Sequence, residues 1–126
     1  MYGLVYTAAE LMKMFRVTVL YPKGENTSFD LDYYRTTHVE VARRELEPHG
    51  IVALEWDSVI AGRAGSPPPF YVASHQIWPS QKEFQAALDD GALARIAEDV
   101  PNFYSEHSVV FVSDIHRHWT RGREEL

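Results

Sequence analysis

The clearest candidate for chemistry in this chain is a histidine that lies among apolar residues spaced for a helix, in the segment 29–46. His38 shares one expected helical face with four residues: Leu31, Tyr34, Val41 and Leu46. Partial withdrawal from water lets the surroundings tune the pKa of an imidazole, so His38 is a candidate general acid or base near neutral pH. The same spacing is typical of a structural histidine that is hydrogen-bonded inside a core, and spacing alone favours that role.

A second histidine, His75, lies in the middle of the expected strand 70–78. Alternation along a strand places it on the same side as Tyr71. If that side lines a cavity, the two side chains are candidates to bind a phenolic or enolic substrate, with His75 in a catalytic role. If it faces the helices, His75 is a core residue. The sequence leaves both possibilities open.

The remaining motifs exclude several kinds of site. His116 and His118 are two residues apart in the C-terminal segment, but no carboxylate or thiolate pattern supplies the further ligands that zinc needs, so we expect no metal site. Gly62 and Gly65 do not form a G-x-G-x-x-G loop, which excludes a Rossmann nucleotide site. The absence of a G-x-S-x-G motif argues against a serine hydrolase.

Composition narrows the class of protein further. The chain has 126 residues, enough for one domain, and a formal net charge of −6, which disfavours binding to nucleic acid or to an anionic membrane surface. It contains no cysteine, so it forms no disulfide and uses no thiolate chemistry, consistent with a reducing compartment. No basic region precedes the first apolar residues, so we expect no signal peptide and a cytoplasmic protein.

Hydrophobic periodicity divides the chain into a central domain, 14–115, an N-terminal extension, 1–13, and a polar C-terminal tail, 116–126. A short helix is expected in the extension after Thr7. Within the domain the pattern predicts strands at 15–21, 51–60, 70–78 and 109–115, and helices at 30–47, from 81 onward, and at 92–98.

Local signals support the expected helix starts. Asp30 has the position of an N-cap, and Phe29 and Tyr34 have the spacing of a hydrophobic staple. Ser80 and Glu83 form a capping box for the second helix. Pro48 is expected to end the first helix near residue 47, and Gly50 permits the reversal that follows.

The order β-α-β-β-α-β predicts an α+β fold of the ferredoxin-like type, with a four-stranded antiparallel sheet and helices on one face. The other face of the sheet also needs cover, because the expected strands are apolar on both alternating sets of residues. A second copy of the same face would provide that cover, so we expect a homodimer formed through the open sheet face.

Three segments occur together in the order and spacing of one known family: FDLDYYRTTH, PPPFYVASHQIWPS and EDVPNF. Between about Met14 and Ile115 the chain resembles the EthD family, named for the degradation of ethyl tert-butyl ether. The resemblance implies a dimeric α+β barrel in which two sheets pack face to face around a cavity. Members often carry the name reductase, and some fungal relatives are dehydratases of aromatic polyketides, so the family implies a fold more firmly than a reaction.

The resemblance also bears on individual residues. His38 matches the histidine of the family's helix motif, which gives its functional role equal weight with the structural one. Asp99 and Asn102 match an Asp-x-Pro-Asn-Phe pattern, where both are expected to build a turn. Asp99 is also a candidate to orient an imidazole beside the cavity. Asn102 and Tyr34 are candidates to contact the substrate, although packing is the favoured role of Tyr34.

These observations favour a small enzyme without a tightly bound cofactor that moves a proton on an apolar, aromatic or polyketide-like molecule. Isomerisation, cyclisation and dehydration are the reactions that such chemistry covers. A protein that binds a small molecule without turning it over is the main alternative. An oxidoreductase, as the family's label suggests, and a haem protein with His38 or His75 as the axial ligand are further alternatives.

Overall fold

The computed structural model describes residues 6–7 and 13–122, so most of the expected short helix after Thr7 lies outside the described residues. The four strands are β1 (Phe15–Pro22), β2 (Ala53–Ser58), β3 (Phe70–Trp78) and β4 (Val109–Asp114). They form one sheet in the order β2-β3-β1-β4, and every neighbouring pair is antiparallel. This arrangement confirms the expected α+β ferredoxin-like fold.

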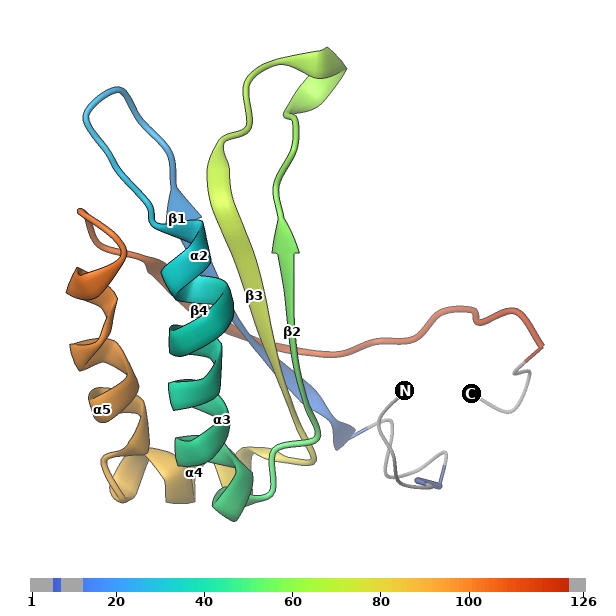
Figure 1. The fold of residues 1–126 in the computed structure, drawn as a ribbon. Helices are drawn as coiled ribbons and strands as arrows, with labels where there is room; N and C mark the ends of the chain where they lie inside the picture. Colours follow the sequence, from blue (N-terminus) through green and yellow to red (C-terminus); the bar gives the residue numbers. More distant parts are fainter. Residues whose placement is uncertain (1–5, 8–12, 123–126) are drawn as a thin grey trace.

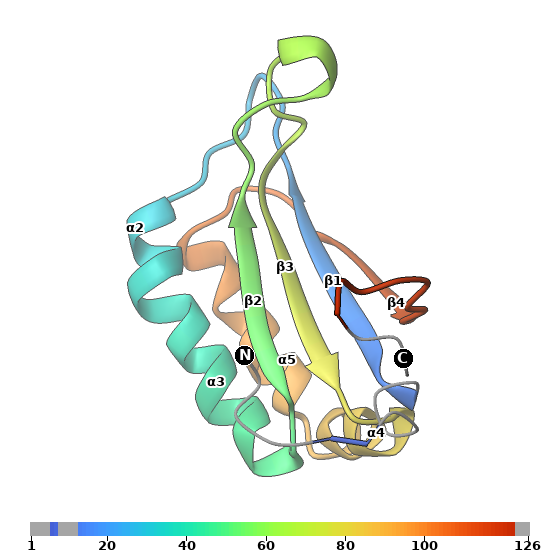
Figure 2. The same ribbon diagram turned by 90° about the vertical axis from the view of Figure 1, so that its right-hand side faces the viewer.

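The helices gather on one side of the sheet, as Figure 1 shows, and Figure 2 views the sheet from the side without helices. They are α2 (Leu31–Tyr33), α3 (Val39–Leu46), α4 (Gln81–Asp89) and α5 (Ala92–Glu98). Short helical turns follow or separate them: η1 (Tyr34–His38), η2 (Glu47–His49) and η4 (Val100–Asn102). A further short turn, η3 (Arg63–Gly65), lies between β2 and β3. In the part of the chain that the structure describes, no helix is long and apolar enough to cross a membrane.

The first helical segment differs from the expected regular helix. Between α2 and α3 it passes through η1, a π-helical turn in which the N–H of Val39 donates to the carbonyl of Tyr34 five residues earlier. The buried residues then follow at intervals of four: Tyr34, His38, Ala42 and Leu46. Leu31, which we expected on this face, is 40% exposed. A widened turn changes the angle between residues before and after it, so a strict α-helical period fails across η1.

The helix ends follow the local signals in the sequence. The Asp30 carboxylate accepts a hydrogen bond from the N–H of Tyr33 at 3.0 Å, and the Phe29 and Tyr34 rings lie 5.5 Å apart, which confirms the N-cap and the hydrophobic staple. The Ser80 hydroxyl accepts from the N–H of Lys82 at 3.3 Å and donates to the Glu83 carboxylate. Gly50 has a φ of 87°, the left-handed conformation that lets the chain turn toward β2.

The main core lies between the helices and one face of the sheet. Phe15 and Val17 point from β1 into this core, and Trp78 joins them from β3. The helices contribute five buried residues: Ala42, Leu46, Ala87, Ala92 and Ile96. The pairing of Val17 with Gln76 and of Val19 with Ser74 places these four side chains on the helix side of the sheet. Thr18 and His75, which also pair, are therefore on the opposite side.

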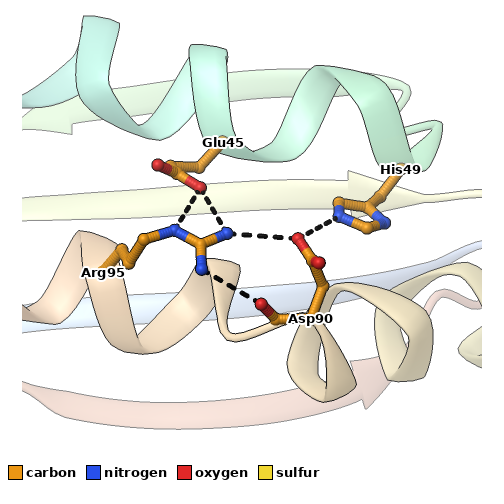
Figure 3. Close-up of polar contacts among 4 residues, drawn as sticks. All are labelled: Glu45, His49, Asp90 and Arg95. Carbon is orange, nitrogen blue, oxygen red and sulfur yellow. Dashed lines mark hydrogen bonds and ion pairs between the residues drawn. The ribbon is translucent and has the colours of Figure 1, made fainter.

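A polar network on the surface links the helices to one another (Figure 3). Arg95 of α5 donates to Glu45 of α3 at 2.8 Å and to the side chain and carbonyl of Asp90 at 3.1 and 3.0 Å. His49 lies 3.1 Å from the same Asp90 carboxylate. The network joins α3 to the connection between α4 and α5, and so fixes the helix layer that covers the sheet.

The strand β4 is exposed along its whole length. Val110 and Val112 on the helix side are 60% and 55% exposed, and Phe111 on the other side is 46% exposed. After β4 the chain extends away from the helices (Figure 1). An edge strand with four consecutive apolar residues and no charge before Asp114 is unusual on a free surface, because such edges pair with other chains.

Candidate active site

A pocket of about 630 Å³ lies between the helix layer and the sheet. Valine, leucine, isoleucine and aromatic side chains make up most of its wall, among them Val17, Leu54, Trp56 and Leu93. The polar residues in the wall include His38, Tyr34, Ser74 and Gln76. The pocket is therefore an apolar site with a few polar groups, as expected for a small-molecule ligand. The expected chamber was between the sheets of two copies, but the pocket that His38 lines lies within one copy, on the helix side of the sheet.

His38 is held by a carboxylate from a distant part of the chain. Its side chain is buried, and its Nδ1 lies 2.9 Å from Oδ2 of Asp99. None of the described residues forms a hydrogen bond to the other ring nitrogen, Nε2. Among the described residues, every side-chain nitrogen or oxygen that is fully buried has a hydrogen-bond partner. Nε2 is therefore not fully buried, and the ring to which it belongs lines the pocket.

The Asp99 carboxylate is shared among three donors. Oδ2 faces His38, whereas Oδ1 accepts from the Tyr33 hydroxyl at 2.6 Å and from the side-chain amide of Asn102 at 2.9 Å. Asn102 also donates to the Tyr33 oxygen at 3.3 Å. The turn η4, which contains Pro101 and follows α5, brings Asn102 back onto Asp99. Asp99 and Asn102 thus both build the turn and support His38 from behind.

The pKa shifts describe a neutral imidazole beside an ionised carboxylate. Burial lowers the pKa of His38 below its ordinary value of 6.5, and this effect outweighs the hydrogen bond to Asp99, which acts in the opposite direction. Burial raises the pKa of Asp99, but the hydrogen bonds from Tyr33, Asn102 and His38 together bring it below its ordinary value. The ionised Asp99 accepts the proton on Nδ1 and leaves a lone pair on Nε2, which is the tautomer of a base directed into the pocket.

Aromatic rings fix the orientation of the imidazole. The Phe103 ring centre lies 4.4 Å from that of His38, and the Tyr34 ring centre lies 5.4 Å from it. Tyr34 packs in turn edge-on against Trp56 at 5.2 Å. Burial raises the pKa of Tyr34 to about 12, against the effect of a hydrogen bond with Ser74, so its hydroxyl stays protonated. Tyr34 therefore both packs and lines the pocket.

Gln76 supplies a further polar group on the opposite wall. Its side-chain oxygen accepts from the indole N–H of Trp78 at 3.1 Å, which directs the amide nitrogen elsewhere. Gln76 is almost fully buried and lines the pocket, so its amide N–H groups are available to a ligand oxygen.

The structure separates His75 from His38. The Nδ1 of His75 lies 3.3 Å from the Thr18 hydroxyl, and its Nε2 lies 3.4 Å from the Asp57 carboxylate. All three belong to the face of the sheet without helices, so His75 is outside the pocket that His38 lines. The sequence left the face of His75 open, and the structure places it away from the helices.

Tyr71 is also away from the pocket wall. Its hydroxyl contacts the Thr27 hydroxyl at 2.8 Å and donates to the Thr27 carbonyl at 3.0 Å, and its ring stacks on Phe29 at 5.2 Å. Tyr71 thus holds the loop between β1 and α2. His116 and His118 are exposed, and within residues 6–7 and 13–122 no three histidine or carboxylate side chains are grouped to hold a metal ion.

Three of the site's residues were not singled out by the sequence analysis. Tyr33 is adjacent to the expected buried face rather than on it. The carboxylate of Asp99, 66 residues later in the Asp-x-x-Asn pair, needs hydrogen-bond donors, and this need was the signal that could have identified Tyr33. Ser74 and Gln76 lie between Val72 and Trp78 on the helix side of β3. Polar residues on the buried side of a strand were the available signal.

Comparisons with known proteins agree with this architecture. The sequence matches no protein-family model and no curated protein sequence. Among solved structures, an EthD-like protein from Ralstonia eutropha JMP134 is similar with a TM-score of 0.76 and 27% identity, over 87% of this chain and 98% of that one. An EthD family protein from Bacillus halodurans C-125 is similar with a TM-score of 0.66 and 16% identity, over 82% and 99% of the two chains.

A hydroxynitrile lyase from Passiflora edulis is similar in fold alone, with a TM-score of 0.57 and 13% identity over 86% of this chain and 99% of that one. The chain therefore has an EthD-like fold, as the sequence resemblance implied. The solved neighbours support a small-molecule enzyme or binding family without defining one activity.

Proposed function

We propose that this protein is an enzyme that moves a proton on an uncharged, apolar or aromatic small molecule, with His38 as the general base and acid. One observation carries the proposal: Asp99 contacts Nδ1 of His38, while the same imidazole ring lines an apolar pocket. We infer that Nε2 faces this pocket. Isomerisation, cyclisation and dehydration all begin with such a transfer. No cofactor takes part in the proposed step.

The proposed step follows from the charges of the pair. Nε2 of the neutral imidazole takes a proton from a carbon or hydroxyl group of the substrate, and the Asp99 carboxylate stabilises the imidazolium that forms. The electron pair left on the substrate moves to its carbonyl oxygen, where the Gln76 amide is placed to donate a hydrogen bond. His38 then returns the proton to another atom, which completes an isomerisation, or to a leaving hydroxyl, which completes a dehydration.

The lining of the pocket supports an apolar substrate. A volume of about 630 Å³ is within the range of sites for small molecules, and most of its wall is aliphatic or aromatic. The charged side chains in the wall are Glu40, Arg43, Glu47 and Glu55, and Arg43 is already bonded to two of these carboxylates. A carboxylate or phosphate on the substrate would find no free cation among them.

A nitrobenzisoxazole is a suitable probe, because it is neutral and aromatic and its ring opens to a coloured phenolate when a base removes one C–H proton. We expect the protein to accelerate this ring opening above the buffer rate. His38→Asn keeps a donor for Asp99 where Nδ1 was and removes Nε2, so it should fold, bind the probe and lose the acceleration. Equal rates for wild type and His38→Asn would reject the proposal.

A binding protein without turnover is the second candidate, and the apolar wall of the pocket is the observation that favours it. Both candidates predict that a neutral aromatic ligand raises the melting temperature. They differ in turnover: the binding protein would bind the nitrobenzisoxazole and leave its rate of ring opening unchanged. An oxidoreductase or a haem protein remains an alternative, and a haemin titration tests the latter.

We further infer a homodimer through the sheet face that carries no helices. Phe111 and Val109 on this face are both 46% exposed, and Leu20 and Ala73 lie beside them in the sheet. A second copy of this face would remove these side chains from water, and burial of apolar surface is the main source of stability in such interfaces.

A further inference from the structure

We infer that Tyr33 is a positioning residue, which acts through Asp99 to keep His38 in the tautomer that a base requires. The inference rests on the proposed role of His38, and it adds a third member to the His38–Asp99 pair. Tyr33 is not among the described residues that line the pocket, so any effect on chemistry must pass through a residue that contacts both Tyr33 and His38.

The two oxygens of Asp99 have separate partners. The Tyr33 hydroxyl donates to Oδ1 at 2.6 Å, and His38 donates to Oδ2 at 2.9 Å. A carboxylate rotates about the bond to its carbon unless both oxygens are held. Because Tyr33 fixes Oδ1, Oδ2 is directed at Nδ1, and the imidazole proton stays on Nδ1 rather than on Nε2.

A second contact joins Tyr33 to the same ring. Phe103 stacks on Tyr33 at a ring-centre distance of 6.1 Å and lies 4.4 Å from the centre of the His38 ring. Tyr33 thus contacts both Asp99 and Phe103, the two residues that hold the imidazole. The hydrogen bond to Asp99 also raises the pKa of Tyr33, so the hydroxyl remains a donor at neutral pH.

The π-helical turn explains how Tyr33 and His38 reach one carboxylate. Residues five apart in an α-helix are rotated by about 140° from each other, on different faces. In η1 the hydrogen bond from Val39 to Tyr34 spans five residues, so positions five apart come closer to one face. Tyr34, one position further, is then free to line the pocket. π-helical turns are frequent at functional sites, and here the turn assembles one.

Nitrogen NMR shifts of the His38 ring test the inference without any substrate. In the wild-type protein at neutral pH we expect Nδ1 to be protonated and Nε2 to be unprotonated. Tyr33→Phe removes only the hydroxyl, and we expect a mixture of the two neutral tautomers. Tyr104→Phe is the matched control, because the Tyr104 hydroxyl donates at 2.6 Å to the Pro22 carbonyl, away from Asp99. We expect the control to keep the wild-type shifts.

Turnover of the nitrobenzisoxazole gives the second measurement. We expect Tyr33→Phe to lower kcat about tenfold with little change in KM, since the misplaced group is the base and not the binding wall. If the His38 shifts of Tyr33→Phe match those of the wild type, Tyr33 has a structural role only and the inference is wrong. A protein with the expected tautomers but no turnover would contradict the proposed reaction and leave the inference about Tyr33 intact. Asn102→Ala removes the other donor to Oδ1 and leaves the Tyr33 hydroxyl in place, so it is a second control, and we expect it to keep the wild-type shifts.

Discussion

His38 and Asp99 are 61 positions apart in the sequence, yet Nδ1 of the imidazole lies 2.9 Å from Oδ2 of the carboxylate. His38 ends the π-helical turn that follows α2, and Asp99 ends α5. The fold brings these two helix segments together on one side of the sheet and so places an imidazole, bonded to a carboxylate, at the wall of an apolar pocket.

The first prediction concerns the base itself. His38→Asn should reduce the ring opening of a nitrobenzisoxazole by about 10²–10⁴-fold, the usual contribution of a general base. The protein should remain folded, because the shorter amide still offers Asp99 a donor. His38→Ala is the harsher variant, since it leaves a gap against Phe103 and an unpaired carboxylate. Retained activity in a folded His38→Asn protein would assign the chemistry to another residue.

The pH dependence of activity provides a second prediction. The base must be neutral, so kcat/KM should rise with pH and reach a plateau above the pKa of His38, which burial holds below 6.5. Asp99→Asn removes the carboxylate that raises this pKa, so the inflection should move to lower pH. The same change should lower the plateau about a hundredfold, because an amide permits the wrong tautomer. An inflection that moves to higher pH, or an unchanged profile, would contradict this account of the pair.

Stability should change with pH in the same range, and this is the third prediction. Because the pKa of His38 is lower in the folded protein than in the unfolded chain, the unfolded chain binds more protons below pH 6.5. The free energy of unfolding should therefore fall as the pH drops from 6.5 toward the pKa of the folded state. The difference between wild type and His38→Asn, measured by urea unfolding at several pH values, isolates this effect from the other histidines. A difference that is constant over that range would show that His38 titrates normally.

Much of the fold was predictable from the sequence because it depends on local pattern. The limits of β3 and α5 agree with the predicted 70–78 and 92–98, since alternating apolar residues and strong helix formers define them. β2 is shorter than predicted, at Ala53–Ser58, although pairing continues through the N–H groups of Val52 and Val59. These backbone hydrogen bonds to β3 lie just beyond both ends of β2, which explains why the apolar segment in the sequence is longer than the strand.

The site was less predictable because it depends on contacts between distant segments. The sequence offered His38 and Asp99 as separate candidates, and only the packing of α5 beside α3 shows that they meet. The face of β3 that carries His75 depends on which side the helices cover, and alternation is symmetrical between the two sides. The π-helical turn had no local signal, so Tyr33 was missed and Leu31 was wrongly placed on the buried face.

The charges in the pocket wall give a fourth prediction, about ligand choice. Arg43 donates to Glu40 at 3.0 Å and to Glu47 at 2.6 Å, so no free cation faces an anionic ligand. Naphthol should raise the melting temperature, and naphthoate, which differs by a carboxylate, should not. Glu47→Gln frees part of Arg43 and should admit naphthoate. Glu98→Gln, which removes an exposed charge outside the pocket wall, is the control and should not admit it.

The same reasoning applies to haem, whose propionates are carboxylates. Titration with haemin should give no Soret band that depends on His38, because the wall offers the propionates no unpaired cation. A band present in the wild type and absent in His38→Asn would overturn this expectation and favour the haem alternative. Stabilisation by naphthoate equal to that by naphthol would show that charge does not select the ligand.

The homodimer is the subject of the fifth prediction, and β4 allows a matched pair of variants. Phe111 points to the face without helices and Val112 to the helix side, and the two are similarly exposed at 46% and 55%. If two copies pack through the face without helices, Phe111→Glu places a charge in the interface and should give a monomer, whereas Val112→Glu should stay dimeric. Light scattering coupled to gel filtration measures the mass of each. Monomers from both variants would instead indicate that the β4 edge itself pairs between copies, and a monomeric wild type would refute the dimer.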